Sequence, residues 1–137
     1  MIGGIGTDIV EVEKIRQAIE RRPEKFYDQV FTQEEVTYCL RYHNPFPSFA
    51  GRFAAKEAIV KALGTGFVRG VGFRDIAITN DEEGRPYPLF SDALLSRFET
   101  PSVFLSISHC HKYAVAFALR IDENPRTPAL TPSLPPS

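Results

Sequence analysis

The stretch that decides the fold is FAGRFAAKEAIVKAL, residues 49–63. Projected at about 100° per residue, it carries apolar side chains on nearly every side. A helix with this pattern is buried on most of its faces, so we expect it to lie at the centre of the fold. Ser48 can cap its first turn, and Gly64 is expected to end it.

The charged residues of this helix fall into two groups. Arg52 and Lys56 lie on one side, which is the usual place for solvated charges. Glu57 and Lys61 lie almost opposite, in a stripe of small side chains that would let a ligand or a second chain approach closely. The simpler interpretation of this pair is an exposed ion pair that stabilises the helix by about 0.2–0.5 kcal/mol. The spacing alone leaves both interpretations open.

Strand and helix patterns surround the central helix. Pro23 is expected to end the first helix, Thr32 and Glu35 form a capping box, and residues 44–47 (NPFP) are interpreted as a helix breaker. The glycines of residues 64–72 predict a flexible loop. This mixture, without βαβ regularity, predicts the α+β class. Strands are predicted at residues 2–10, 73–79, 86–90, 103–108 and 113–121, and further helices at residues 11–22, 32–42 and 91–98.

Composition limits the kind of protein this can be. The 137 residues fit one domain, expected at residues 1–123 and followed by a disordered tail rich in Pro, Ser and Thr at residues 124–137. A net charge of −1 gives no general attraction to nucleic acid or to an anionic membrane. Without a secretory signal or a membrane-spanning apolar run, a cytoplasmic protein is expected, with Cys39 and Cys110 as buried free thiols.

Asp8 is a carboxylate inside an apolar strand pattern, GTDIV. Aspartate is disfavoured in strands and costly to bury without a partner, so its presence needs a reason. It could cap the junction between the strand and the next helix. It could instead bind a hard cation, because magnesium takes few protein carboxylates and fills its other positions with water and substrate phosphates. One Asp and one Glu from separate elements, with a lysine nearby, would suit a magnesium–pyrophosphate site.

The strand pattern LSISH, residues 105–109, ends in polar residues. Leu105 and Ile107 are expected to face the core, which leaves Ser106 and Ser108 on the opposite face. His109 at the strand end could contact a phosphate. A serine hydrolase is not indicated, because the chain has no Gly-x-Ser-x-Gly elbow.

The first predicted helix carries basic residues on one face. Lys14 and Arg21 lie seven residues apart, and Arg22 and Lys25 follow. Ordinary solvated charge is the simpler interpretation. A docking face for an acidic protein is the functional one, and its attraction would weaken with salt.

Three blocks of the sequence together resemble the holo-acyl-carrier-protein synthase family of phosphopantetheinyl transferases. They are GIGTDIVE at residues 4–11, GRFAAKEA running to KALGTG at residues 51–66, and SISH at residues 106–109. The resemblance covers residues 2–121 in order and with fitting spacing.

The resemblance implies a small α+β phosphopantetheinyl transferase fold, with an antiparallel sheet packed against the long central helix. It further implies a homotrimer that binds coenzyme A in clefts between subunits. The enzyme would transfer the 4'-phosphopantetheine group of coenzyme A to a serine of an apo acyl carrier protein and release adenosine 3',5'-bisphosphate. The carrier supplies the nucleophile, so no activated serine is needed in this chain.

The family's functional positions carry over one by one. Asp8 and Glu57 would hold Mg²⁺, with Glu57, directly or through a water, as the candidate base. Lys61 would contact phosphate and assist the departing nucleotide. The other implied coenzyme A contacts are Arg52, His109, Gly64 and, as a weaker candidate, Ser108. The implied contacts with the acyl carrier protein are Lys14, Arg21, Arg22 and Lys25.

Two features depart from the family pattern. The tail adds nothing that the family needs, and Pro23-Glu24 interrupts the basic docking segment, so the carrier recognised stays open. The residues do not decide between fatty acid, polyketide and peptide synthesis, nor whether acylated coenzyme A is accepted. Two other functions remain: a catalytically silent module that binds carrier proteins, and a magnesium-dependent phosphohydrolase acting on nucleotides.

Overall fold

The computed structural model describes residues 1–64, 66–67, 72–98 and 102–122. Part of the expected glycine loop and the whole of the expected tail lie outside these residues. In chain order the elements are β1 (Ile2–Glu11), α1 (Val12–Arg21), α2 (Pro23–Val30), α3 (Gln33–Cys39), α4 (Phe46–Leu63), η1 (Phe73–Asp75), β2 (Ile76–Asn80), β3 (Pro86–Phe90), α5 (Asp92–Leu95), β4 (Ser102–His109) and β5 (Tyr113–Ile121).

An antiparallel sheet forms one side of the molecule. Its strand order is β1-β5-β4, so β1 and β4 are its two edges. Asp8 on β1 and Ile107 on β4 both lie opposite Ala116 of β5, which fixes the register across the sheet. The hairpin of β2 and β3 pairs separately. These elements confirm the predicted α+β class.

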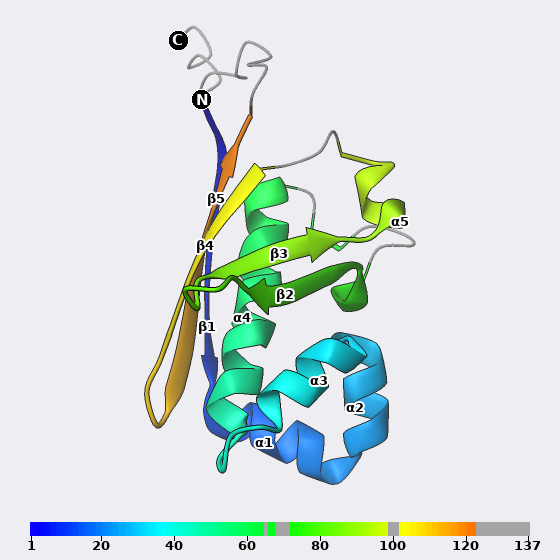
Figure 1. Cartoon of the computed structure of the whole chain (residues 1–137), viewed down its shortest axis with the longest axis vertical. Coiled ribbons are helices and arrows are strands. Elements are labelled where there is room, and N and C mark those ends of the chain that lie inside the picture. Colours follow the sequence, from blue (N-terminus) through cyan, green and yellow to red (C-terminus); the bar gives the residue numbers. More distant parts are fainter. Residues whose placement is uncertain (65, 68–71, 99–101, 123–137) are drawn as a thin grey trace, which may run out of the picture.

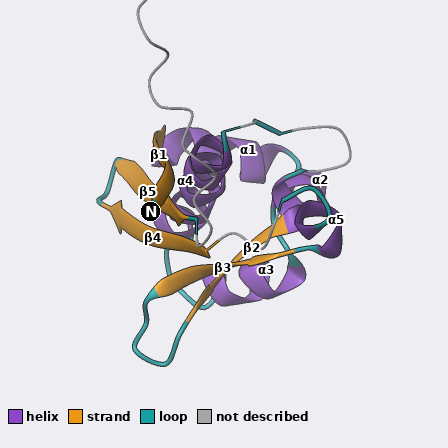
Figure 2. Cartoon of the chain, turned by 90° about the horizontal axis from the view of Figure 1, so that it is seen from above, coloured by secondary structure: helices purple, strands orange, loops and turns teal. Residues whose placement is uncertain are grey.

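Helix α4 runs along the inner face of this sheet, and the β2–β3 hairpin and helices α1 to α3 lie around its other sides (Figures 1 and 2). Twelve of its eighteen residues are buried, in agreement with the apolar pattern around the helix. The predicted stop at Gly64 is also confirmed, because Gly64 adopts a left-handed conformation with φ of 85°.

The start of α4 differs from the prediction. The helix begins at Phe46, and Pro45 and Pro47 sit where no intrahelical N–H donor is needed, so the supposed breaker is the first turn. Ser48 is inside the helix and donates its hydroxyl to the Cys39 sulfur at 3.2 Å, so it is not the cap.

Other helix and strand boundaries also differ from the prediction. The first helix stops at Arg21, just before Pro23, as predicted. Pro23 is also the first residue of a further helix, α2, a position that proline favours and a helix that the sequence did not predict. The capping box of Thr32 and Glu35 is confirmed, although α3 ends at Cys39 rather than near residue 42. Residues 73–75 form a single 3₁₀ turn before β2, where the alternating pattern predicted strand.

Two glycines of β1 allow the strand to lie directly on α4. A Cβ atom at Gly6 would overlap the carbonyl oxygen of Ala58, and one at Gly4 would overlap that of Ala62. The obstacle at both positions is helix backbone, which cannot rotate away as a side chain can. The glycine spacing of the first sequence block therefore sets the distance between β1 and α4.

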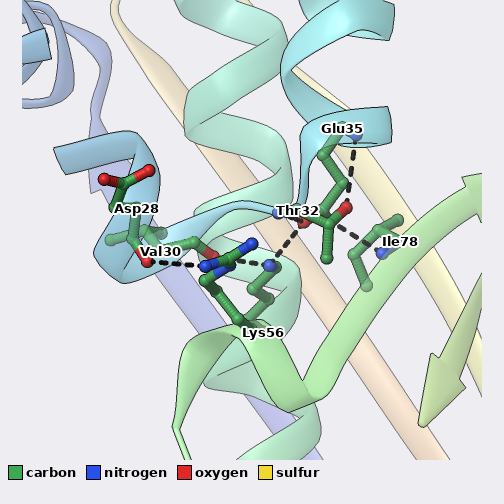
Figure 3. A network of polar contacts seen from close by, with 7 residues as sticks. Asp28, Val30, Thr32, Glu35, Lys56 and Ile78 are labelled. Atoms are coloured by element: carbon green, nitrogen blue, oxygen red, sulfur yellow. Dashed lines mark hydrogen bonds and ion pairs between the residues drawn. The ribbon is translucent and has the colours of Figure 1, made fainter. Parts of the chain in front are cut away.

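The expectation that Arg52 and Lys56 face solvent is wrong. Arg52 is 6% exposed, and Lys56 is fully buried and paired with Glu35 of α3 (Figure 3). Helical periodicity assigned this side to water because it contains charges, but α2, α3 and β2 cover it. Burial lowers the pKa of the Lys56 ammonium, although the carboxylate of Glu35 acts in the opposite direction.

The two cysteines have different environments. Cys39 is a buried free thiol, as predicted. Cys110 is exposed in the connection between β4 and β5, so the prediction of burial is wrong there. Within the part of the chain that the structure describes, no helix is both long enough and apolar enough to cross a bilayer.

Replacing Gly6 by Ala is expected to destabilise the protein by about 1–3 kcal/mol, because the new methyl group meets a helix carbonyl and β1 must move away. Urea unfolding measures the change. Gly72→Ala is the matched control, since a Cβ there meets no described atom within 4 Å. Equal stability of the two variants would contradict the close approach of β1 to α4.

Candidate active site

Asp8, Glu57 and Lys61 lie together where β1 crosses the open face of α4. Lys61 Nζ donates to the carbonyl oxygen of Thr7 at 2.9 Å and lies 3.4 Å from Asp8 Oδ1. Glu57 and Lys61 are one turn apart on the only stripe of the second half of α4 that is not buried. The three residues that the sequence proposed for metal and phosphate chemistry therefore form one cluster, here called the carboxylate cluster.

The electrostatics of the carboxylate cluster favour a cation. Burial, and after it the negative charge of Asp8, raise the pKa of the Glu57 carboxyl, whereas the Lys61 ammonium lowers it. Two carboxylates that repel each other are relieved by a divalent ion placed between them. The Asp8 side chain is 18% exposed, so an ion and its waters have access.

The donor set fits magnesium. Among the described residues, no group of three or more His, Cys, Asp or Glu side chains could enclose a metal ion. Two carboxylates from separate elements suffice for Mg²⁺, which keeps several waters and binds phosphate oxygens in its remaining positions. The Lys61 side chain, 55% exposed, supplies a positive charge beside them.

A second cluster, here called the arginine cavity, lies on the other side of α4. The cavity has a volume of about 470 Å³, and Arg52 and His109 both line it. The Arg52 Nη2 donates to Asn80 Oδ1 at 2.8 Å, and its guanidinium carbon lies 4.1 Å from the centroid of the Tyr38 ring. Arg52 Nε is buried and has no hydrogen-bond partner among the described residues. An arginine held by a ring and an amide, with a donor unused, suits an anionic ligand.

Gly51 brings the end of β4 close to α4. A Cβ atom there would lie 3.0 Å from Ile107 Cγ2 and 3.9 Å from His109 Cδ2. The small residue thus allows Ile107, two residues before His109, to pack directly against the helix. The predicted alternation of β4 is confirmed, because Leu105 and Ile107 pack against the core.

Two proposed coenzyme A contacts lie elsewhere. Ser108 is exposed on the outer face of the sheet and does not line the arginine cavity. Gly64 caps the C-terminal end of α4, also away from that cavity. Sequence reasoning missed Tyr38 and Asn80, and the only signal for Asn80 was its position before the DEEG turn.

Within the part of the chain that the structure describes, no residue of the carboxylate cluster lines the arginine cavity. Arg52 and Glu57 are five residues apart on α4, which places them about 140° apart around the helix. Asp8 and His109 lie on opposite edges of the sheet.

The outer face of the sheet is unusually apolar. Large hydrophobic side chains on all three strands are exposed there. Monomeric globular proteins rarely expose so many large hydrophobic side chains in one patch. They are Ile5, Ile9, Phe104, Tyr113, Val115 and Phe117.

The basic residues near α1 are partly neutralised. Arg16 forms ion pairs with Glu13 and Glu20, and Lys14 Nζ lies 3.7 Å from Glu11 Oε1. Arg21, Arg22 and Lys25 are exposed and form no ion pair with any residue that the structure describes. They leave a positive surface at the junction of α1 and α2.

Known proteins resemble this chain over most of its length. A family model described as the 4'-phosphopantetheinyl transferase superfamily matches residues 4–118. The holo-[acyl-carrier-protein] synthase of Protochlamydia amoebophila is 50% identical over 116 residues, which cover 85% of this chain and 95% of that protein.

Solved structures give the same result. The holo-[acyl-carrier-protein] synthase of Neisseria meningitidis has a TM-score of 0.80 at 36% identity, covering 89% of this chain and 100% of that one. The Bacillus anthracis synthase in complex with CoA (3',5'-ADP) has a TM-score of 0.74 at 37% identity, covering 88% and 96%. This chain therefore belongs to the 4'-phosphopantetheinyl transferase superfamily, within the holo-[acyl-carrier-protein] synthase family of enzymes.

Proposed function

We propose that this protein transfers the 4'-phosphopantetheine group of coenzyme A to a serine hydroxyl of an apo acyl carrier protein, with Mg²⁺, and releases adenosine 3',5'-bisphosphate. The observation that carries the proposal is the meeting of Asp8, Glu57 and Lys61 at the contact of β1 with α4. The relatives' names and the coenzyme A bound to the Bacillus anthracis protein support the choice of substrate.

Each residue of the carboxylate cluster would have a separate role in the transfer. Asp8 and Glu57 would hold Mg²⁺, which when bound neutralises charge on the pyrophosphate and orients the phosphoryl group for attack. Glu57 would accept the proton of the carrier's serine hydroxyl. Lys61 would contact the phosphate and balance the negative charge on the departing nucleotide.

The arginine cavity would bind the nucleotide end of coenzyme A. Arg52 would bind a phosphate through its guanidinium, and His109 lines the same cavity. Because the two clusters face opposite sides of one chain, the complete site would combine the carboxylate cluster of one subunit with the arginine cavity of its neighbour. A homotrimer, as the family resemblance implies, would supply that contact, and the apolar outer face of the sheet offers the surface for it.

The carrier protein would dock beside the carboxylate cluster. Arg21, Arg22 and Lys25, with Lys14, present positive charge to an acidic partner. Such attraction speeds association and orients the partner more than it tightens the complex. The carrier's serine would then reach the cluster from the α1 side.

Glu57→Gln is expected to reduce the rate of transfer by about 10²–10⁴-fold, because it removes both a metal ligand and the candidate base. Mass spectrometry of an apo carrier protein, incubated with coenzyme A and Mg²⁺, measures the gain of one phosphopantetheine group. Glu34→Gln, an exposed position on α3, is the matched control and should keep full activity. Full activity of Glu57→Gln would remove the role assigned to this residue. Release of the bisphosphate without any carrier would favour a phosphohydrolase instead.

Mixing two inactive variants tests whether the site is shared between subunits. Glu57→Gln and Arg52→Ala subunits, refolded together in equal amounts, are expected to recover activity, since about one quarter of the interfaces would combine two intact clusters. The measurement is the transfer rate of the mixture against each variant alone. If both clusters act within one chain, no intact site forms and the mixture stays inactive.

A further inference from the structure

Lys56 and Glu35 are the most deeply buried charged side chains among the described residues, at 0% and 2% exposure, and neither belongs to the carboxylate cluster. Lys56 Nζ donates to Glu35 Oε1 and to the carbonyl oxygen of Val30, both at 2.6 Å. Figure 3 shows Lys56 reaching from α4 toward the segment between α2 and α3. The pair is thus fully enclosed by protein.

The Glu35 carboxylate has further donors. Its Oε1 accepts from the Thr32 backbone N–H at 2.8 Å, and its Oε2 accepts from the Ile78 N–H at 2.9 Å. Ile78 lies opposite Pro88 in the hairpin, and its N–H bonds to Glu35 instead of to β3. The network therefore joins four segments: the end of α2, the start of α3, α4 and β2.

Stability alone is a weak reason for such a pair. Removing two charges from water offsets most of their attraction, and apolar residues of similar volume often serve as well. The network instead fixes the relative positions of the segments that it joins, because each of its hydrogen bonds requires a fixed position of both partners.

Three of these elements, α3, α4 and β2, hold the Arg52 guanidinium in the arginine cavity. Tyr38 follows Glu35 by three residues on α3, Arg52 precedes Lys56 by one turn on α4, and Asn80 follows Ile78 by two residues on β2. Glu35 and Ile78 thus each have a neighbour on their own element that contacts the Arg52 guanidinium, through the ring of Tyr38 or the amide of Asn80, and Lys56 shares α4 with Arg52 itself.

We propose that Glu35 and Lys56 are positioning residues for Arg52, which orient its guanidinium toward a phosphate of the nucleotide by fixing α3 and β2 against α4. The inference rests on the proposed function for the identity of the ligand. Loss of the pair would let Tyr38 and Asn80 move relative to Arg52. The arginine would keep its charge but lose its orientation, and affinity for the nucleotide would fall.

The test is a double-mutant cycle on the full chain, with the dissociation constant for adenosine 3',5'-bisphosphate measured by calorimetry. Glu35→Gln combined with Lys56→Met removes both charges at similar volume. This double variant is expected to bind at least about tenfold more weakly, as is Arg52→Ala. All three substitutions together should bind no more weakly than Arg52→Ala alone, because the pair acts through Arg52. Should the double variant fail to fold, Lys56→Arg enters the same cycle and is expected to show the same lack of additivity.

Ile59→Val, a buried change on α4 outside the network, is the control for general loosening and should leave binding unchanged. Three results would overturn the inference: normal binding by the charge-free variant, losses that simply multiply in the triple variant, or an equal loss in Ile59→Val.

A spectroscopic reading separates this inference from the proposed function. The NMR signal of the buried Arg52 Nε–H should shift or broaden in the charge-free variant but not in Ile59→Val, with or without ligand. If the unaltered protein did not bind the bisphosphate, the proposed function would fall, and this signal would decide the positioning role. An unchanged signal would refute it.

Discussion

The candidate site depends on the direct contact of the β1 backbone with α4. Gly4 and Gly6 lie against the carbonyl oxygens of Ala62 and Ala58, with no side chain between strand and helix. Asp8 follows two residues later on the same face of the strand and so lies beside the open stripe of α4. A strand held further out would separate the two carboxylates. The two glycines thus matter to the candidate site because they set the distance between β1 and α4.

Helix α4 contributes residues to both clusters. Glu57 and Lys61 face β1, whereas Arg52 faces α3 and β2. The carboxylate cluster and the arginine cavity of one chain therefore face different directions. The exposed apolar face of the sheet, with Phe104 and Phe117, gives a physical reason for chains to associate. The buried Glu35–Lys56 pair would fix the shape of the arginine cavity, just as Gly4 and Gly6 fix the distance between β1 and α4 at the carboxylate cluster.

Sequence reasoning succeeded where a local pattern had one meaning. The apolar residues around α4, the Thr32–Glu35 capping box and the Gly64 stop all follow from local rules. It failed where tertiary contacts decide: Lys56 was assigned to solvent because the covering helices could not be foreseen, and Asn80 was missed for the same reason. Pro23 correctly marked the end of α1, but the pattern gave no sign that a new helix, α2, begins at the same residue. The meeting of Asp8 with Glu57 was suggested by the family resemblance rather than by spacing.

Crystallography with Mn²⁺ in place of Mg²⁺, in the presence of coenzyme A, tests the central claim most directly, because Mn²⁺ shares the oxygen ligands of magnesium and scatters anomalously. The account predicts one anomalous peak within bonding distance of both carboxylates, about 2.0–2.3 Å from an oxygen of Asp8 and one of Glu57, with the diphosphate completing the coordination. A peak that contacts neither residue, or a coenzyme bound away from the β1–α4 contact, would contradict it.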